Sequence, residues 1–259
     1  MELDLYQVDA FAEKVFQGNP AAICPLEEWL PDELMQKIAE ENNLSETAFF
    51  VPEGDNYHLR WFTPKSEVDL CGHATLAAAH VLFTHLGYNK DNIAFETRSG
   101  ILEVKQVNGG YSMLFPASLP TETTTPEALI AAIGTAPVKI LSAFDYIAVL
   151  ENETQVRELQ PNLHKVAELD LRGLLVTAPG DNCDFVSRCF FPNLDIPEDP
   201  VTGSAHCELS PYWGEVLGKT ELNAMQLSER SGAIVCVIHE DKVELIGKAV
   251  DYLKGTISV

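Results

Sequence analysis

The feature that most constrains this chain is an internal repeat with a period of about half its length. Residues 60–64 read Arg-Trp-Phe-Thr-Pro and residues 188–192 read Arg-Cys-Phe-Phe-Pro, so both fit the pattern R-x-F-x-P, 128 residues apart. The tripeptide Arg-Ser-Gly occurs at 98–100 and at 230–232, and Pro31-Asp32 has a counterpart in Pro161-Asn162. Three matches in the same order at nearly constant spacing indicate a duplication.

The hydrophobic patterns of the two halves support the duplication. In the first half we expect strands at 3–8, 21–24, 48–51 and 57–62, helices at 31–42 and 74–86, and a hairpin at 101–107 and 111–115. In the second half we expect strands at 146–150, 174–178 and 185–190, helices at 163–169 and from 204 to about 218, and a hairpin at 233–239 and 242–246. Pro211 is expected to disturb the last helix.

These elements predict an α+β fold of two pseudo-symmetric lobes, residues 1–117 and 118–259. In each lobe a curved, mixed sheet would wrap around the longer helix, since that arrangement buries both apolar faces. A cleft between two such lobes is the expected place for a ligand.

The charge balance excludes several partners. There are 17 basic and 39 acidic residues, for a formal net charge of −22. Nucleic acids and anionic membranes are bound by clustered Lys and Arg, so we expect neither as a partner. The N-terminal residues have no basic segment followed by an apolar one, and none of the six cysteines forms a C-x-x-C pair. A reduced, cytoplasmic protein is the expectation.

The two copies differ in the loops that precede their longer helices. Eleven residues after each repeated arginine stand Cys71 in the first copy and Asp199 in the second. Gly72-His73 and Thr202-Gly203-Ser204 follow them at the expected helix starts. A helix N-terminus presents unpaired amides and a positive dipole, so both starts are candidate sites for a carboxylate. Such residues can also act only as helix caps.

A second difference is Glu46, which lies between a helix and a strand in Ser45-Glu46-Thr47-Ala48-Phe49. The repeat places it opposite Leu174, Leu175 or Val176, in an apolar run. A carboxylate among apolar neighbours has a raised pKa and suits a general base. The alternative is a glutamate at a helix end that points to water.

Five segments together resemble a known family. They are Asp9-Ala10-Phe11, Phe16-x-Gly18-Asn19-Pro20-Ala21-Ala22, Ser45-Glu46-Thr47-Ala48-Phe49, Cys71-Gly72-His73-Ala74-Thr75 and the run Glu198-Asp199-Pro200-Val201-Thr202-Gly203-Ser204-Ala205-His206-Cys207. In this order, from about residue 5 to about residue 250, they resemble the phenazine-biosynthesis PhzF-like family.

The resemblance implies a diaminopimelate-epimerase-like fold and an isomerase that moves a proton, and with it a double bond, without a cofactor. By motif, the implied catalytic residues are Glu46, His73 and Asp199. Ser204 would line the same site, and Gly72 and Gly203 would donate amides to a substrate carboxylate. Thr202 and Cys71 are further candidate substrate-binding residues. The substrate would be a small amino- or hydroxy-substituted carboxylate. A homodimer is expected by analogy only.

Three alternatives stay open from the residues. The first alternative is an epimerase, since epimerases of this fold use a cysteine from each lobe. The second lobe has Asp199 rather than a cysteine near the equivalent point. The epimerase alternative is therefore a racemase that uses Cys71 and Asp199. A metal site of Cys71, His73, His206 and Cys207 is disfavoured because adjacent helix residues point about 100° apart. The third alternative is a protein that binds a small molecule without catalysis.

Overall fold

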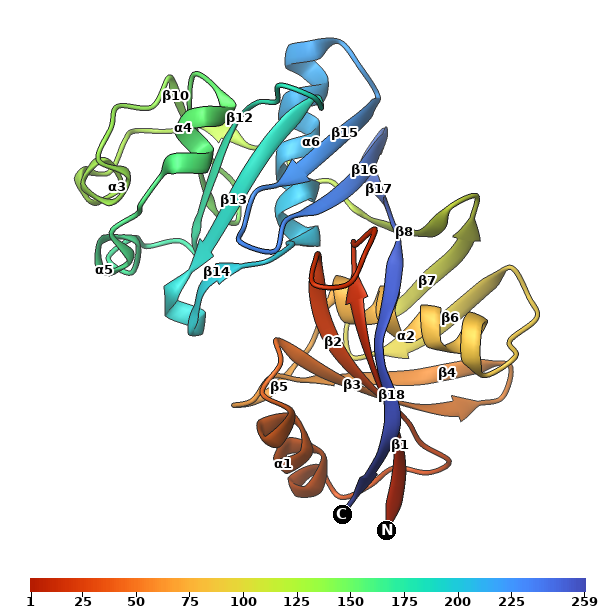
Figure 1. The fold of residues 1–259 in the computed structure, drawn as a ribbon. Helices are drawn as coiled ribbons and strands as arrows, with labels where there is room; N and C mark the ends of the chain where they lie inside the picture. Colours follow the sequence, from red (N-terminus) through yellow and green to blue (C-terminus); the bar gives the residue numbers. More distant parts are fainter. The chain divides into compact units, whose positions relative to one another are not determined.

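The computed structural model describes residues 1–259 and divides the chain into two compact units. The first unit comprises Met1–Leu114 and Ile246–Val259, and the second comprises Phe115–Leu245 (Figure 1). The sequence prediction assigns everything after residue 117 to the second lobe, and the structure differs for the last segment. The reason is β18 (Ala249–Ser258), which pairs antiparallel with β1 (Glu2–Ala10) along its whole length, from Glu2 opposite Ser258 to Ala10 opposite Ala249.

The first unit is a mixed sheet with two helices. Besides β1 and β18, its strands are β2 (Asn19–Pro25), β3 (Glu46–Glu53), β4 (Asn56–Phe62), β5 (Glu67–Val68), β6 (Asn92–Thr97), β7 (Gly100–Val107) and β8 (Gly110–Pro116), and its helices are α1 (Asp32–Asn42) and α2 (Gly72–His85). The strands lie in the order β18-β1-β2-β3-β4-β6-β7-β8. The β2–β3 and β4–β6 pairs are parallel, and the others are antiparallel.

Helix α2 forms the core of the first unit. It contacts β1, β2, β3, β7 and β18, so the sheet curves around it. All residues from His73 to Leu82 are buried, and four of them are alanines, whose small side chains let strands approach from several sides. A helix that is apolar all round is typical of a fully enclosed position. The predicted arrangement of a sheet wrapped around the longer helix is confirmed here.

The second unit repeats the design. Its strands are β9 (Thr121–Glu122), β10 (Lys139–Ser142), β11 (Tyr146–Val149), β12 (Leu174–Pro179), β13 (Phe185–Phe191), β14 (Ile196–Asp199), β15 (Glu221–Gln226), β16 (Gly232–His239) and β17 (Lys242–Gly247). Its helices are α3 (Glu127–Ile133), α4 (Glu153–Glu158), α5 (Leu163–Val166) and α6 (Gly203–Leu217), with a 3₁₀ turn at Pro192–Leu194. Pro211 lies inside α6 without ending it.

The strand pairings reveal the duplication directly. In the first unit β2–β3 is parallel, β3–β4 antiparallel, β4–β6 parallel and β6–β7 antiparallel. In the second, β11–β12, β12–β13, β13–β15 and β15–β16 repeat that series in the same order. The longer helix follows the third strand of the series in both units. This agreement in pairing and order is the pseudo-symmetry that the repeat predicts.

The repeated arginines have the same structural task in both units. Arg60 on β4 donates two hydrogen bonds to Glu67 on β5, and its guanidinium lies 5.2 Å from the centre of the Phe62 ring. Arg188 on β13 likewise donates two hydrogen bonds to Glu198 on β14 and lies 5.1 Å from the Phe190 ring. Bidentate pairs of this kind are geometrically specific. Each pair therefore fixes the chain just before the longer helix.

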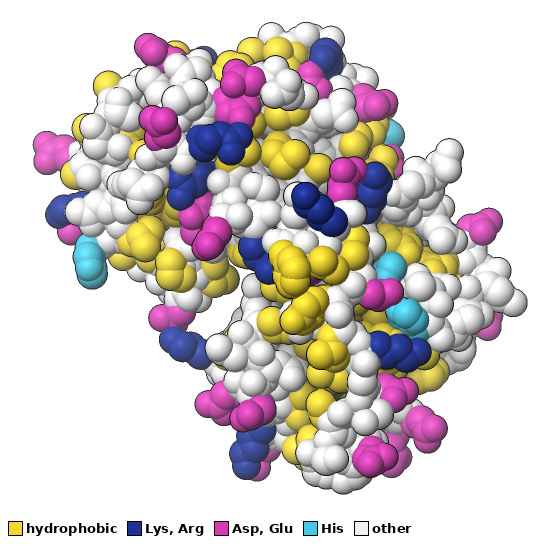
Figure 2. All heavy atoms as spheres, viewed as in Figure 1, with side chains coloured by type: hydrophobic (Ala, Val, Ile, Leu, Met, Phe, Trp, Pro, Cys, Tyr) yellow, Lys and Arg dark blue, Asp and Glu magenta, His cyan; other side chains and the backbone are white.

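The surface of the first unit carries an apolar strip. Figure 2 shows hydrophobic side chains gathered over the region of β1 and β18. Phe16, Tyr252 and Leu253 are among the exposed large hydrophobic residues, and the Phe16 and Tyr252 rings meet edge to face with centroids 5.7 Å apart. None of the helices is long and apolar enough to cross a membrane.

Candidate active site

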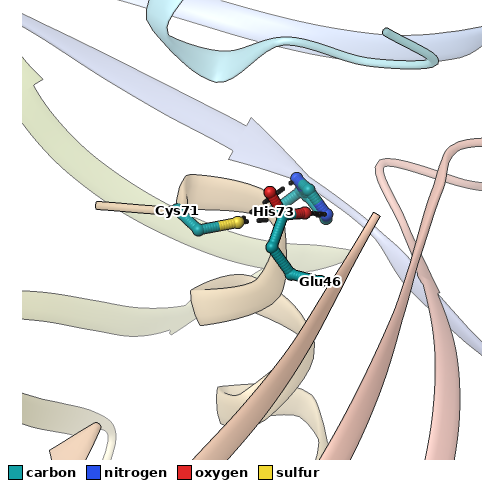
Figure 3. A group of neighbouring side chains, drawn as sticks. All are labelled: Glu46, Cys71 and His73. Carbon is teal, nitrogen blue, oxygen red and sulfur yellow. Dashed lines mark hydrogen bonds and ion pairs between the residues drawn. The ribbon is translucent and has the colours of Figure 1, made fainter. Parts of the chain in front are cut away.

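Three predicted site residues of the first unit meet in one buried group. Glu46 is the first residue of β3, Cys71 directly precedes α2, and His73 is the second residue of that helix (Figure 3). Each is less than a tenth exposed. Glu46 Oε2 lies 2.9 Å from His73 Nε2, and Cys71 Sγ lies 3.5 Å from His73 Nδ1. The structure thus brings together a carboxylate, an imidazole and a thiol.

The chain before Glu46 is braced by the Gly18-Asn19-Pro20 turn. Ser45 Oγ donates to Asn19 Oδ1 at 3.1 Å, and Asn19 itself is fully buried. Gly18 has φ +66°, and a Cβ there would lie 2.1 Å from the Ala10 carbonyl oxygen, so only glycine fits. Asn42 Nδ2 donates to Thr47 Oγ1 at 3.0 Å on the other side of Glu46. These contacts fix the position of the backbone at Glu46, from which the carboxylate extends.

The electrostatics favour a charged Glu46–His73 pair. Burial alone would lower the pKa of the His73 imidazole, but the neighbouring Cys71 and Glu46 outweigh it and raise this pKa well above 6.5. Burial, together with the nearby Glu46 carboxylate, raises the pKa of the Cys71 thiol to about 11. Cys71 can raise the pKa of His73 only as a thiolate, and near neutral pH it is an uncharged thiol. At that pH the raised pKa of His73 therefore rests on the Glu46 carboxylate.

The expected surroundings of Glu46 need one correction. The sequence places it among apolar neighbours, but His73 and Cys71, distant along the chain, lie beside it. In the second unit the corresponding strand β12 begins with Leu174, Leu175 and Val176, which are fully buried and carry no carboxylate. A carboxylate next to a protonated imidazole can accept a proton at one atom while the imidazole supplies one at another.

The second unit places its predicted residues around the start of α6. Asp199 ends β14, Thr202 is the residue before the helix, and Gly203 and Ser204 are its first two residues. The Thr202 hydroxyl donates to Asp199 Oδ2 at 2.6 Å. This bond brings the aspartate to the helix start.

Asp199 and Cys71 are not equivalent in position. Cys71 immediately precedes α2, whereas three residues separate Asp199 from Gly203, the first residue of α6. The second loop is longer because it contains the 3₁₀ turn at Pro192–Leu194. Equal spacing from the two arginines therefore does not make Asp199 equivalent to Cys71. The counterpart of Cys71 is Thr202, because each of them directly precedes its helix.

Neither longer helix has its first amides capped by a side-chain oxygen. Thr202 stands at the cap position of α6, but its hydroxyl is committed to Asp199. Cys71 occupies the same position in α2, where a thiol replaces the usual capping oxygen. Gly72 and Gly203 are the first residues of their helices, and their uncapped amide groups can donate hydrogen bonds to an anion.

Sequence reasoning missed four residues that build the second-unit group. Gln226 on β15 accepts from the Thr202 amide at 2.8 Å and donates to the Asp199 carbonyl at 2.7 Å. Arg172 donates to Ser204 Oγ at 3.2 Å and forms a two-pronged ion pair with the fully buried Asp145. Burial and the nearby Asp145 raise the pKa of Glu208, on α6, to about 8. No local pattern marks these residues, because their partners lie 24 to 63 residues away.

A metal ion fits poorly among Glu46, Cys71 and His73. One ligand atom of each lies within 4.8 Å of the others, which is close enough for a shared ion. However, a metal binds neutral histidine and thiolate, and the raised pKa values of His73 and Cys71 both favour the protonated forms. His206, a member of the metal set weighed from the sequence, has its Nδ1 2.8 Å from the Thr202 carbonyl oxygen. It is fully buried, and that burial lowers its pKa to about 4.

The fold is also found in a solved structure of low sequence identity. A crystal structure of a hydroxyproline epimerase from Agrobacterium vitis is similar in fold, with a TM-score of 0.59 over 99% of this chain and 92% of that one, at 9% identity. The two-unit α+β fold is therefore similar to the fold of that structure.

The chain belongs to the phenazine biosynthesis-like (PhzC-PhzF) family, which it matches over residues 8–255. A crystal structure of a PhzF-family protein from Enterococcus faecalis has a TM-score of 0.98 and 48% identity, with full coverage of both chains. A curated protein of Pseudomonas aeruginosa, described as an uncharacterized isomerase, is 50% identical over 99% of both chains. A similar protein of Halalkalibacterium halodurans, 44% identical over 99% of both chains, has the same description. The predicted family is confirmed, and the predicted enzyme class, isomerase, agrees with these names.

Proposed function

We propose that this protein is a cofactor-independent isomerase that moves a proton between carbon atoms of a small carboxylate. The observation that carries the proposal is the buried contact of 2.9 Å between Glu46 Oε2 and His73 Nε2. The raised pKa of His73 favours a protonated imidazole beside the Glu46 carboxylate, so an acid and a base lie next to each other.

The proposed reaction begins with the carboxylate of Glu46. It removes a proton from a carbon atom of the substrate, and the electron pair left behind spreads into a conjugated system. The positive His73 imidazolium stabilises the developing negative charge. Protonated Glu46 then returns the proton to a different carbon, which moves the double bond and regenerates the carboxylate. No electrons are gained or lost overall.

The substrate is proposed to be an amino- or hydroxy-substituted carboxylate. Support comes from the two helix starts, Gly72 in α2 and Gly203-Ser204 in α6, which suit a carboxylate group. Asp199 is proposed to hold the amine or hydroxyl, with Thr202 as its hydrogen-bond partner. That one substrate uses residues of both units stays a prediction from the sequence, as do a homodimer and a cytoplasmic location.

The decisive experiment is substitution of Glu46 by glutamine. A panel of amino-substituted carboxylates, including a dihydro-hydroxyanthranilate, is incubated with the protein in D₂O, and ¹H NMR follows C–H exchange and isomerisation. Loss of a general base lowers rates by about 10²–10⁴-fold, so Glu46→Gln is expected to fall by that factor for any substrate found.

Glu53→Gln is the matched control for this experiment. Glu53 ends the same strand β3, and its carboxylate lies 3.7 Å from His58 in a pair that is largely exposed. Its turnover is expected to equal that of the unchanged protein. Undiminished turnover in Glu46→Gln would remove Glu46 from the mechanism.

An epimerase is the second candidate, because the Cys71 thiol lies 3.5 Å from His73 Nδ1 in the same group. A thiol with a pKa of about 11 serves as an acid near neutral pH rather than as a base. Deuterium that enters the α-carbon with inversion, and a Cys71→Ala variant that loses this inversion, would favour the epimerase. Turnover that survives Cys71→Ala favours the isomerase.

A further inference from the structure

A second group of titratable side chains lies in the first unit, away from Glu46 and His73. It joins the C-terminal end of α2 to β18. Asp251 Oδ1 lies 3.1 Å from His80 Nε2 and 3.0 Å from His85 Nε2, so one carboxylate oxygen faces two imidazoles. The proposed isomerase reaction uses none of these residues.

The end of α2 is shaped so that the two histidines meet. Five residues in a regular α-helix turn through about 500°, which would point His80 and His85 roughly 140° apart. Here the Leu86 amide donates to the Val81 carbonyl at 3.2 Å, an i→i−5 bond that widens the last turn. The two rings stand with centroids 6.1 Å apart.

We propose that His80, His85 and Asp251 bind a divalent transition-metal ion of the Zn²⁺ class. Two imidazoles and a carboxylate are a typical ligand set for such an ion, with a fourth position for water. At metal–ligand bonds of about 2.0–2.1 Å, the ligand atoms of a tetrahedral site lie about 3.3 Å apart. The two N–O separations, 3.1 and 3.0 Å, are within a few tenths of this value, and all three ligand atoms lie within 4.8 Å of one another.

The surroundings of His80 match those of a metal ligand. Its other ring nitrogen, Nδ1, lies 2.9 Å from the Tyr111 hydroxyl, which fixes the ring orientation.

The site is also accessible to an ion from solvent. The Asp251 side chain is 41% exposed and that of His85 is 19% exposed, whereas His80 is buried. Figure 2 shows histidine side chains beside acidic ones next to the apolar strip over β1 and β18. The neighbouring cation Lys254 lies over the Tyr6 ring, 5.2 Å from its centre. A bound ion would link α2, which carries His73 at its other end, to β18.

In the test, protein treated with a chelator is titrated with Zn²⁺ alone, and calorimetry measures the heat of binding. One binding site per chain is expected, with a dissociation constant in the micromolar range. His85→Ala and Asp251→Asn, both at partly exposed positions, should each weaken binding about 100-fold or more, and Tyr111→Phe about 10-fold to 100-fold. Zn²⁺ should raise the melting temperature of the unchanged protein but not of His85→Ala.

Two control variants separate this site from other histidine and cysteine groups. His239 pairs with Glu244 at 3.0 Å on the surface, so His239→Ala tests an ordinary His–Glu pair. Cys71→Ala tests the Glu46 group, and Co²⁺ bound through Cys71 would show a thiolate-to-cobalt charge-transfer band. Both variants should bind Zn²⁺ as tightly as the unchanged protein does. Co²⁺ bound to the unchanged protein should show no thiolate band. No Zn²⁺ binding, equal binding by His85→Ala, or loss in Cys71→Ala overturns the proposal and leaves a hydrogen-bonded His–Asp–His group.

Discussion

At the scale of single residues, the arrangement around His73 depends on a balance between burial and charge. The imidazole is buried, which disfavours its charged form, yet the Glu46 carboxylate 2.9 Å away keeps it protonated. A buried ion pair of this kind costs desolvation on both sides and is a poor device for stability alone. Its presence is better explained by chemistry that needs a proton at a fixed atom.

The raised pKa of His73 predicts a definite pH dependence of stability. The native state holds this proton more tightly than the unfolded chain, so the stabilisation is complete below pH 6.5 and declines as pH rises through the native pKa. His73→Gln removes this contribution. In urea denaturation, the difference in unfolding free energy between the unchanged protein and His73→Gln should fall above pH 6.5, by at most about 1.4 kcal/mol per pH unit.

His58→Gln, at a histidine that is partly exposed, is the control for the pH series. A difference for His73→Gln that stays constant between neutral and mildly alkaline pH would show that His73 is not charged in the native state.

At the scale of elements, helix α2 serves two purposes with its two ends. Its N-terminal end carries Cys71 and His73, its C-terminal end carries His80 and His85, and the alanine-rich stretch between them is enclosed by the sheet. Because the middle of the helix is packed on all sides, its ends are held in place relative to the strands they face.

Truncating the packed middle of α2 should therefore be costly. Leu76 is fully buried, and removing a buried leucine side chain to alanine costs about 2–5 kcal/mol. Leu86, at the end of the same helix, is 41% exposed, and Leu86→Ala should cost about 1 kcal/mol or less. Chemical denaturation of both variants checks the contrast. Equal costs would mean that α2 is not enclosed as described.

At the scale of the whole molecule, the first unit is built from both ends of the chain. Strand β18 forms a full-length pair with β1, and its Asp251 reaches the two histidines of α2. The second unit, Phe115–Leu245, is continuous in sequence. The two units therefore depend on the C-terminal residues to different degrees.

Deleting residues 249–259 should affect only one unit. Without β18, strand β1 loses its antiparallel partner, so hydrogen exchange measured by mass spectrometry should show faster exchange for Glu2–Ala10. Strands β12 and β13 of the second unit pair with each other and should keep their protection. Unchanged protection of β1 in the shortened chain would contradict this dependence.

The sequence predicts much of this fold because periodicity marks its central elements. The helix expected at 74–86 is α2, and the strands expected at 57–62 and 185–190 are β4 and β13. Strand β18 was not predicted, because most of its side chains are exposed and it includes Lys254 and Gly255. Its pairing with β1 is a contact between distant segments, which no local pattern encodes.

The candidate site divides in the same way. Glu46, Cys71 and His73 can be found from motifs and from the difference between the two copies, and the structure brings them together. Arg172 and Gln226 could not be found, since each acts through a partner more than twenty residues away. The pKa of His73 also depends on such a partner, so only the folded chain reveals it.

The pairing of β1 with β18 has a consequence for synthesis on the ribosome. Residues 249–259 emerge only after all of Phe115–Leu245 has been made. N-terminal domains usually fold first as the chain is translated. Here the order is reversed, because the second unit has all its strands while the first still lacks one. Until β18 arrives, the edge of β1 is open, and the nascent chain is exposed to pairing with other strands for that interval.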